Sequence, residues 1–252
     1  MRKVVLVVGL IAAMVVSAVG VAIAQSGDSV TASSEVSSGG TPKKPQNLKK
    51  VHYTASVDGP NDTTRADTAY RLVSKWTGLK FNSKGFDTCD VNVVTTAQTD
   101  SSCPKGSLLA DGRIEAIVGA ATDPTSMSLC KRNVRLYNGG GGDVFVYNYG
   151  PPADCFSQTW IAPAPGTIKN KKKSNTMVFD LPIPPNIQEF IPGVKGYFSL
   201  IDVTFNNKVK EDGKTYIQGI GCGKQKNRKF TFTAYSPSDP KGISDTAKAG
   251  KC

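Results

Sequence analysis

The sequence predicts an all-β fold, an antiparallel β-sandwich of about ten strands with jelly-roll or immunoglobulin-like topology, stabilised by disulfides. Apolar and polar residues alternate along many short segments, which is typical of strands with one buried face. Turns rich in Gly, Pro, Asn and Asp separate these segments. Six cysteines follow an export signal, an arrangement typical of disulfide-bonded secreted proteins.

The first 24 residues have the layout of a secretory signal peptide. Arg2 and Lys3 form a positive start, no charge occurs from residue 4 to residue 24, and Ala22-Ile23-Ala24 is a small-x-small cleavage pattern. The uncharged run of 21 residues could also span a bilayer, so an uncleaved N-terminal anchor is the alternative. In both cases the absence of Lys and Arg until Lys43 places the remaining chain outside the cytoplasm, secreted or associated with the cell envelope.

The chain after the signal divides into a leader and one domain. Residues 25–47 are rich in Ser, Thr and Gly without apolar periodicity, which predicts a flexible leader. Residues 48–252 are predicted to form a single β-sandwich domain, a common size for such folds. A boundary within the Pro-, Gly- and Lys-rich segment 162–174 is the alternative.

Nine segments beyond residue 50 alternate in the manner of strands. They are 51–57, 70–76, 114–118, 134–136, 143–149, 177–181, 197–209, 216–220 and 229–235. The segments 138–142 and 211–214 are Gly-containing and predict hairpin turns. Prolines 182, 184 and 185 exclude a helix or central strand there, and 186–190 could form one helical turn.

The cysteines are predicted to form three disulfides, because their number is even and the chain is exported. Six cysteines allow 15 pairings, and short loops favour the sequential pattern. The expected pairs are Cys89–Cys103, Cys130–Cys155 and Cys222–Cys252.

Charge is unevenly distributed along the chain, whose formal net charge is +11. Residues 25–168 carry 14 basic and 13 acidic side chains, whereas residues 169–252 carry 15 basic and 7 acidic ones. This asymmetry predicts a polyanionic partner, which for an exported protein is an anionic cell-envelope polymer or lipid surface. Known DNA- and RNA-binding motifs are absent, so no specific nucleic acid is expected.

Two basic clusters are the candidate binding residues. If their loops meet in space they form one polyanion-binding patch; otherwise they are two separate lysine-rich loops that keep the protein soluble. The clusters consist of Lys169, Lys171, Lys172 and Lys173, followed by Lys224, Lys226, Arg228 and Lys229.

No catalytic, metal or cofactor site is predicted. His52 is the only histidine, no CxxC pair occurs, and nucleophile-elbow and phosphate-loop patterns are absent. Asp111, Glu115 and Asp202 lie on or beside predicted strands, so an extracellular carbohydrate-active or other hydrolase with a carboxylate pair is the alternative function. A convergent pair in a cleft would favour that enzyme, whereas scattered carboxylates would favour binding or structure.

Aromatic and apolar residues suggest two other ligands. The Pro-rich apolar segments 181–185 and 190–194 could line the mouth of a cavity for an apolar ligand, or simply cover the end of the core. Five aromatic side chains could stack on sugar rings, although such residues more often fill a β core. They are Trp76, Trp160, Tyr147, Tyr149 and Tyr197.

Several short motifs spread over residues 85–252 resemble exported proteins of high-GC Gram-positive bacteria. The motifs are Cys103-Pro104-Lys105-Gly106-Ser107 before a strand ending in Val118-Gly119, Cys155, Gln158-Thr159-Trp160, Asp180-Leu181-Pro182, Gly221-Cys222-Gly223-Lys224 and Cys252. The resemblance implies export and a β-sandwich, and it assigns no activity and no site residue. The sequence as a whole predicts a non-catalytic exported protein that binds, or contributes structure to, the cell envelope.

Overall fold

The computed structural model of the chain describes residues 27–150, 162–208, 210–223 and 225–252. The predicted signal peptide, 1–24, lies outside the described residues. Among the described residues, no helix is long and apolar enough to cross a membrane.

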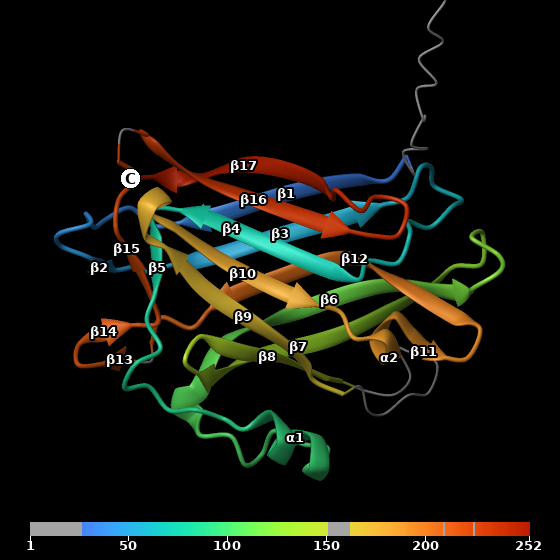
Figure 1. Cartoon of the computed structure of the whole chain (residues 1–252), viewed down its shortest axis with the longest axis horizontal. Helices are drawn as coiled ribbons and strands as arrows, with labels where there is room; N and C mark the ends of the chain where they lie inside the picture. The colour runs from blue at the N-terminus through green and yellow to red at the C-terminus, as the bar shows by residue number, and fades with distance from the viewer. Residues whose placement is uncertain (1–26, 151–161, 209, 224) are drawn as a thin grey trace, which may run out of the picture.

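Eleven antiparallel strands follow one another in a single barrel-like sheet (Figure 1). In spatial order they are β1 (Ser29–Val36), β3 (Val51–Asp58), β12 (Val194–Phe205), β6 (Leu108–Ala120), β7 (Ser128–Gly140), β8 (Asp143–Tyr149), β9 (Ala164–Lys171), β10 (Thr176–Pro182), β4 (Arg71–Thr77), β16 (Asn227–Tyr235) and β17 (Ile243–Lys251). The all-β, antiparallel prediction is confirmed. The predicted sandwich differs from this arrangement, because one continuous curved sheet replaces two separate sheets.

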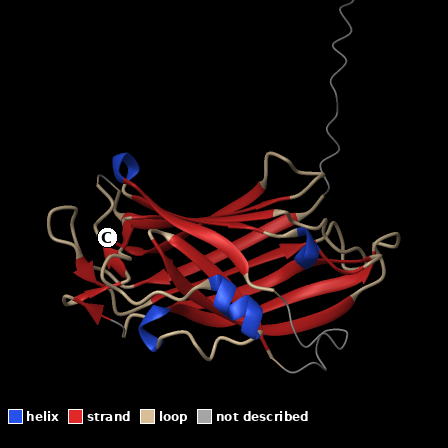
Figure 2. Ribbon diagram, turned by 60° about the horizontal axis from the view of Figure 1, so that its bottom comes forward, coloured by secondary structure: helices blue, strands red, loops and turns tan. Residues whose placement is uncertain are grey.

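Smaller elements close the two ends of the barrel and cover part of its outside (Figure 2). One end carries a three-stranded sheet and a short hairpin, and the opposite end carries a strand paired with β12 and a single helical turn. The elements are β2 (Gln46–Asn47), β5 (Leu79–Phe81), β15 (Ile217–Gly219), β13 (Lys210–Glu211), β14 (Lys214–Thr215), β11 (Glu189–Ile191), α1 (Val91–Ala97), α2 (Pro185–Gln188) and the 3₁₀ turns 105–107 and 172–174.

The two edge strands, β1 and β17, lie beside each other, so the sheet is nearly closed. We call the line along which β1 and β17 meet the seam. Here a side chain, not the backbone of a neighbouring strand, accepts the hydrogen bond of a β1 amide: the Asp245 carboxylate accepts from the Ala32 N–H at 2.9 Å. Gly250 allows the closest approach, since a Cβ at this position would lie 2.3 Å from the Val36 carbonyl oxygen. Gly250 also has a φ of +111°, which disfavours any other residue.

Arg228 ties the end of the seam together. Its side chain is fully buried, and its guanidinium donates to the carbonyl oxygens of Gly39 at 2.7 Å, of Ser37 at 3.4 Å and of Lys251. Burial lowers the pKa of this guanidinium. Arg228, on β16, therefore connects the segment that follows β1 to the last residue of β17.

Inward-facing residues of the strands form one large core. Aromatic rings fill the part of the core where β4 and β16 meet: Trp76 stacks on Phe230 with ring centroids 4.8 Å apart, and Tyr53 meets Trp76 edge-on at 5.2 Å. Such rings bury large apolar areas and stabilise this end strongly.

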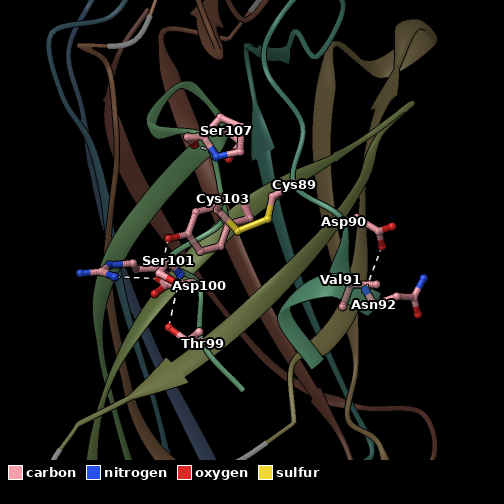
Figure 3. Close-up of a disulfide and its surroundings, with 12 residues drawn as sticks. Cys89, Asp90, Val91, Asn92, Thr99, Asp100, Ser101, Cys103 and Ser107 are labelled. Carbon is pink, nitrogen blue, oxygen red and sulfur yellow. Dashed lines mark hydrogen bonds and ion pairs between the residues drawn. A yellow bond between two sulfur atoms is a disulfide. The ribbon is translucent and has the colours of Figure 1, made fainter. Parts of the chain in front are cut away.

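A disulfide-bonded loop covers the outer face of β7 and β8 (Figure 3). Cys89 bonds to Cys103, and between them α1 begins where the Asp90 carboxylate accepts from the Asn92 N–H. Asp100 holds the loop down, because its carboxylate accepts from Arg135 Nη1 at 2.7 Å and from the Tyr137 hydroxyl at 2.6 Å.

Most local predictions agree with this structure. Each of the nine alternating segments contains a strand, and both Gly-containing turns join hairpin strands. The helical turn α2 overlaps the expected segment 186–190 but begins at Pro185, and Pro182 ends the central strand β10. The prediction that the prolines exclude a helix or central strand is therefore wrong at these two positions, because a proline is tolerated as the first residue of a helix and at a strand end. The pairs Cys89–Cys103 and Cys222–Cys252 are confirmed, and the described part of the chain contains no free thiol. Cys155, the expected partner of Cys130, lies outside the described residues.

The predicted leader, 25–47, is wrong in its central part. Residues 29–36 form β1, which pairs with β3 over its whole length. The sequence here is mostly Ser, Thr and Ala, and only Ala32 and Val36 are buried. An edge strand with so few apolar residues lacks the alternation that marks the other strands.

Replacing Arg228 by alanine should lower the free energy of unfolding by about 3 kcal/mol, because three carbonyl groups lose their donor and a void forms. Urea unfolding measures this change. The neighbouring exposed Lys229, replaced by alanine, is the matched control and should change stability by no more than about 0.5 kcal/mol. Equal stability of the two variants would contradict the role of Arg228 at the seam.

Candidate functional site

The strand order brings the two predicted basic clusters to one end of the barrel. Lys171 pairs with Thr176, which pairs with Thr77, and the Lys229 N–H donates to the Thr77 hydroxyl at 2.8 Å. The turn at Gly78 joins the same regions, since it donates to the Asn175 carbonyl and accepts from the Ile220 N–H. Segments separated by more than 50 residues in sequence thus become neighbours in space.

Further lysines extend this region across five strands. In the adjoining row, Lys169 lies opposite Val178, which lies opposite Lys75. On the other side, Lys229 lies directly opposite Lys248 of β17. We call the five outward side chains Lys75, Lys169, Lys171, Lys229 and Lys248 the lysine face.

Four more lysines flank the lysine face at the end of the barrel. Lys172 and Lys173 are exposed on the 3₁₀ turn after β9, and Lys226 and Lys251 are exposed near the Cys222–Cys252 disulfide. Strands lie about 4.8 Å apart, so the face is about 19 Å wide from β9 to β17. Neighbouring lysines are therefore separated by roughly one Debye length, about 8 Å at physiological ionic strength, and their fields add.

The lysine face lacks acidic side chains that would neutralise it. The outward positions between its lysines are occupied by the four threonines Thr77, Thr176, Thr231 and Thr246 and by Val178. The nearest outward carboxylate on these strands, Asp180, pairs with Arg71 at the far end of β10. Among the described residues, no ion pair involves a lysine of this face.

The cross-strand pair Lys229–Lys248 is informative because it opposes stability. Like charges directly opposite each other on antiparallel strands are destabilising. A protein that only needed soluble strands would gain by placing one acid at either position. The pair therefore concentrates positive charge on the lysine face at a small cost in stability.

The opposite side of the barrel shows a different pattern. On β3, β12 and β6, Asp202 lies between two bases, 2.8 Å from His52 Nε2 and 3.4 Å from Arg113 Nε. Glu115 lies 3.7 Å from Lys131 on β7. Acidic and basic groups alternate here, as expected for an ordinary solvated surface.

The hydrolase alternative depended on Asp111, Glu115 and Asp202. These carboxylates lie on the outer surface of the neighbouring strands β6 and β12, where Asp202 and Glu115 are paired with bases. They do not converge on a cleft with a second carboxylate. Within the described residues, no group of three or more His, Cys, Asp and Glu side chains could hold a metal ion.

Not every predicted basic residue belongs to the site. Lys169, Lys171, Lys172, Lys173, Lys226 and Lys229 are exposed at the same end of the barrel. Arg228 is fully buried at the seam and cannot contact a polymer, so its inclusion in the patch was wrong. Lys224 lies outside the described residues.

The aromatic candidates are not arranged for stacking on sugars. Trp76 and Tyr197 are buried in the core, and Tyr147 and Tyr149 stack on each other beneath the disulfide loop. Trp160 lies outside the described residues.

Lys75 and Lys248 are the residues of the face that sequence clusters did not reveal. Each is an isolated lysine on a strand, and only the pairing of β4 and β17 with β16 brings it to the others. The alternation of inward and outward residues along β4 did predict that Lys75 faces outward, because it stands between the inward-facing Ser74 and Trp76.

Comparison of this chain with protein-family models, curated proteins and solved structures finds no match.

Repulsion within the lysine face should reduce stability at low salt. Changing Lys75, Lys171, Lys229 and Lys248 together to glutamine should raise the free energy of unfolding by about 0.5–1 kcal/mol at low ionic strength. The gain should shrink in 1 M salt, where the Debye length is about 3 Å. Urea titrations at both salt concentrations measure it, and a loss above about 1 kcal/mol would show instead that these lysines hold the fold together.

Proposed function

We propose that this protein is an exported, non-catalytic binding protein that attaches to a linear anionic polymer of the cell envelope through the lysine face. The observation that carries the proposal is the convergence of five lysines from four strands on a surface without acids. Disulfides are consistent with a location outside the cytoplasm.

The shape of the face favours a polymer over a small anion. Its charges are spread over about 19 Å of the outer surface of the sheet. A single phosphate or carboxylate could contact only one or two of them, whereas an extended chain could contact all. Threonine hydroxyls between the lysines could donate to polymer oxygens, as hydroxyls commonly do at phosphate and sugar groups.

The residue type favours recognition of charge rather than of one chemical group. All five cations of the face are lysines, which act as flexible point charges, and none is an arginine, whose planar fork selects carboxylate or phosphate geometry. Affinity should accordingly depend on polymer charge density and length.

The lysine face is poorly suited to insertion into a bilayer. Proteins that lie in a membrane interface usually combine basic residues with exposed apolar side chains. In the described part of the chain, the exposed large apolar residues are Tyr70, Val93, Met127, Leu129 and Ile191, and none belongs to the lysine rows. A hydrated polymer is therefore the partner that this surface fits.

Binding of the purified protein to long-chain polyphosphate and to dextran sulfate tests the proposal. The quadruple variant Lys75→Gln, Lys171→Gln, Lys229→Gln and Lys248→Gln should bind at least about 100-fold more weakly, since each ammonium group near an anionic surface contributes about 1 kcal/mol. Affinity of the parent should fall steeply with salt.

The control variant removes the same charge elsewhere, by changing the exposed residues Lys105, Lys195, Lys208 and Lys241 to glutamine. It should bind within about threefold of the parent if position matters more than net charge. Equal weakening of both variants would reduce the effect to net charge and reject the lysine face as a site. Tighter binding to anionic lipid vesicles than to either polymer would favour a membrane partner.

A further inference from the structure

An open groove lies at the same end of the barrel as the lysine face. Its lining comes from β2, β5 and the loop after it, the β13–β14 hairpin and β15, which lie together at this end (Figure 1). Its volume of about 1140 Å³ slightly exceeds the roughly 300–1,000 Å³ typical of clefts that hold small ligands. The groove is therefore large enough for one or more units of a polymer.

Hydrogen bonds connect the groove to the lysine face. β5 follows β4 after the single residue Gly78. The Phe81 N–H donates to Asn170 Oδ1 at 2.9 Å, and Asn170 Nδ2 donates to the Phe81 carbonyl at 2.8 Å. Asn170 stands between Lys169 and Lys171 of the lysine face. A polymer lying on the lysine face could therefore continue over the end of the barrel into the groove.

Side-chain amides from three distant segments join in the lining of the groove. Asn82 Nδ2 donates to Gln218 Oε1 at 3.0 Å, and Gln218 Nε2 donates to Asn47 Oδ1 at 3.0 Å. Asn47 Nδ2 in turn donates to the Gly213 carbonyl at 2.7 Å. These bonds hold the three amides in fixed orientations before a ligand binds, which lowers the entropic cost of binding.

The amide network leaves hydrogen-bonding groups for a ligand. Asn82 Nδ2 also donates to the Thr215 carbonyl, so both of its hydrogens are used, but Asn82 Oδ1 accepts no hydrogen bond from the described residues. Gln218 and Asn47 each use one of their two amide hydrogens within the same part of the chain. An acceptor beside unused N–H donors matches neighbouring hydroxyl groups, since each hydroxyl both donates and accepts.

The charge of the groove differs from that of the lysine face. Three lysines of the lining, Lys80, Lys84 and Lys214, are offset by Glu211 and Asp212, which leaves a net charge of +1. The lysine face has no acidic side chain among its lysines. Charge attraction should therefore act mainly on the face, and the groove is suited to the uncharged groups of a polymer.

We propose that this groove binds hydroxyl-bearing units of the anionic polymer, so that the partner is a polyanion built from sugar or polyol units. The inference rests on the proposed function, because the lysine face supplies the attraction and the groove adds chemical selectivity. Neighbouring hydroxyl groups donate to Asn82 Oδ1 and accept from the amides of Gln218 and Asn47. A polyanion without hydroxyl groups binds through the lysine face alone.

Polygalacturonate and polyacrylate with equal numbers of carboxylates test this inference. Both are linear polycarboxylates, and only polygalacturonate carries hydroxyl groups. Polyacrylate has the higher charge density, so it should bind more tightly if charge alone decides. In titrations at the same ionic strength, the unmodified protein should instead bind polygalacturonate about fivefold more tightly, as expected for added hydrogen bonds.

Asn82→Leu should abolish this preference. The variant should bind polyacrylate within about twofold of the parent, since the lysine face is a separate surface, and this binding confirms that the variant is folded. Asn82→Ser is the milder substitute if it is not. The matched control Asn186→Leu changes an exposed asparagine on α2, at the opposite end of the barrel, and should keep the preference.

Two results would overturn the inference: the parent binds polyacrylate as tightly as polygalacturonate, or folded Asn82→Leu keeps the preference. The quadruple glutamine variant of the lysine face separates these results from a failure of the proposed function. Weak binding of both polymers by this variant supports the lysine face whatever the groove does. Unchanged binding of both polymers would reject the proposed function, and the inference with it.

Discussion

The closure of β1 against β17 is the constraint on which the rest of the structure depends. An edge strand exposes unpaired N–H and C=O groups, which invite aggregation unless they are covered. Here side chains satisfy some of these edge groups by hydrogen bonding. Asp245 accepts from the Ala32 N–H, and Arg228 donates to carbonyl groups on both sides of the seam. The Cys222–Cys252 disulfide lies at the same end, where it restrains the terminus of β17.

Closure determines both the outer surface and the interior. Because β17 is held in place, Lys248 stays opposite Lys229, and the lysine face spans five strands instead of four. The curvature needed for closure also leaves an interior that aromatic rings fill at one end and only partly at the other. The lysine face and the packing of the interior thus follow from one architecture.

Local structure was predictable from the sequence because it depends on near neighbours. Alternation located the strands, and the Asp212-Gly213 pair, with both φ angles positive, marked a hairpin turn. Long-range pairing was not predictable: nothing around Ser29–Val36 shows that it joins a sheet, and nothing local separates the buried Arg228 from the exposed Lys229. The basic clusters indicated three of the five lysines of the face, while Lys75 and Lys248 required the strand register.

Amide hydrogen exchange at Ala32 tests the closed seam most directly. In a closed barrel the Ala32 N–H is bonded to Asp245, so its exchange should be as slow as that of amides in the central strands. Asp245→Ala should accelerate exchange at Ala32 while residues of β6 and β7 remain protected. Fast exchange at Ala32 in the unmodified protein, at the rate of an exposed edge strand, would contradict closure.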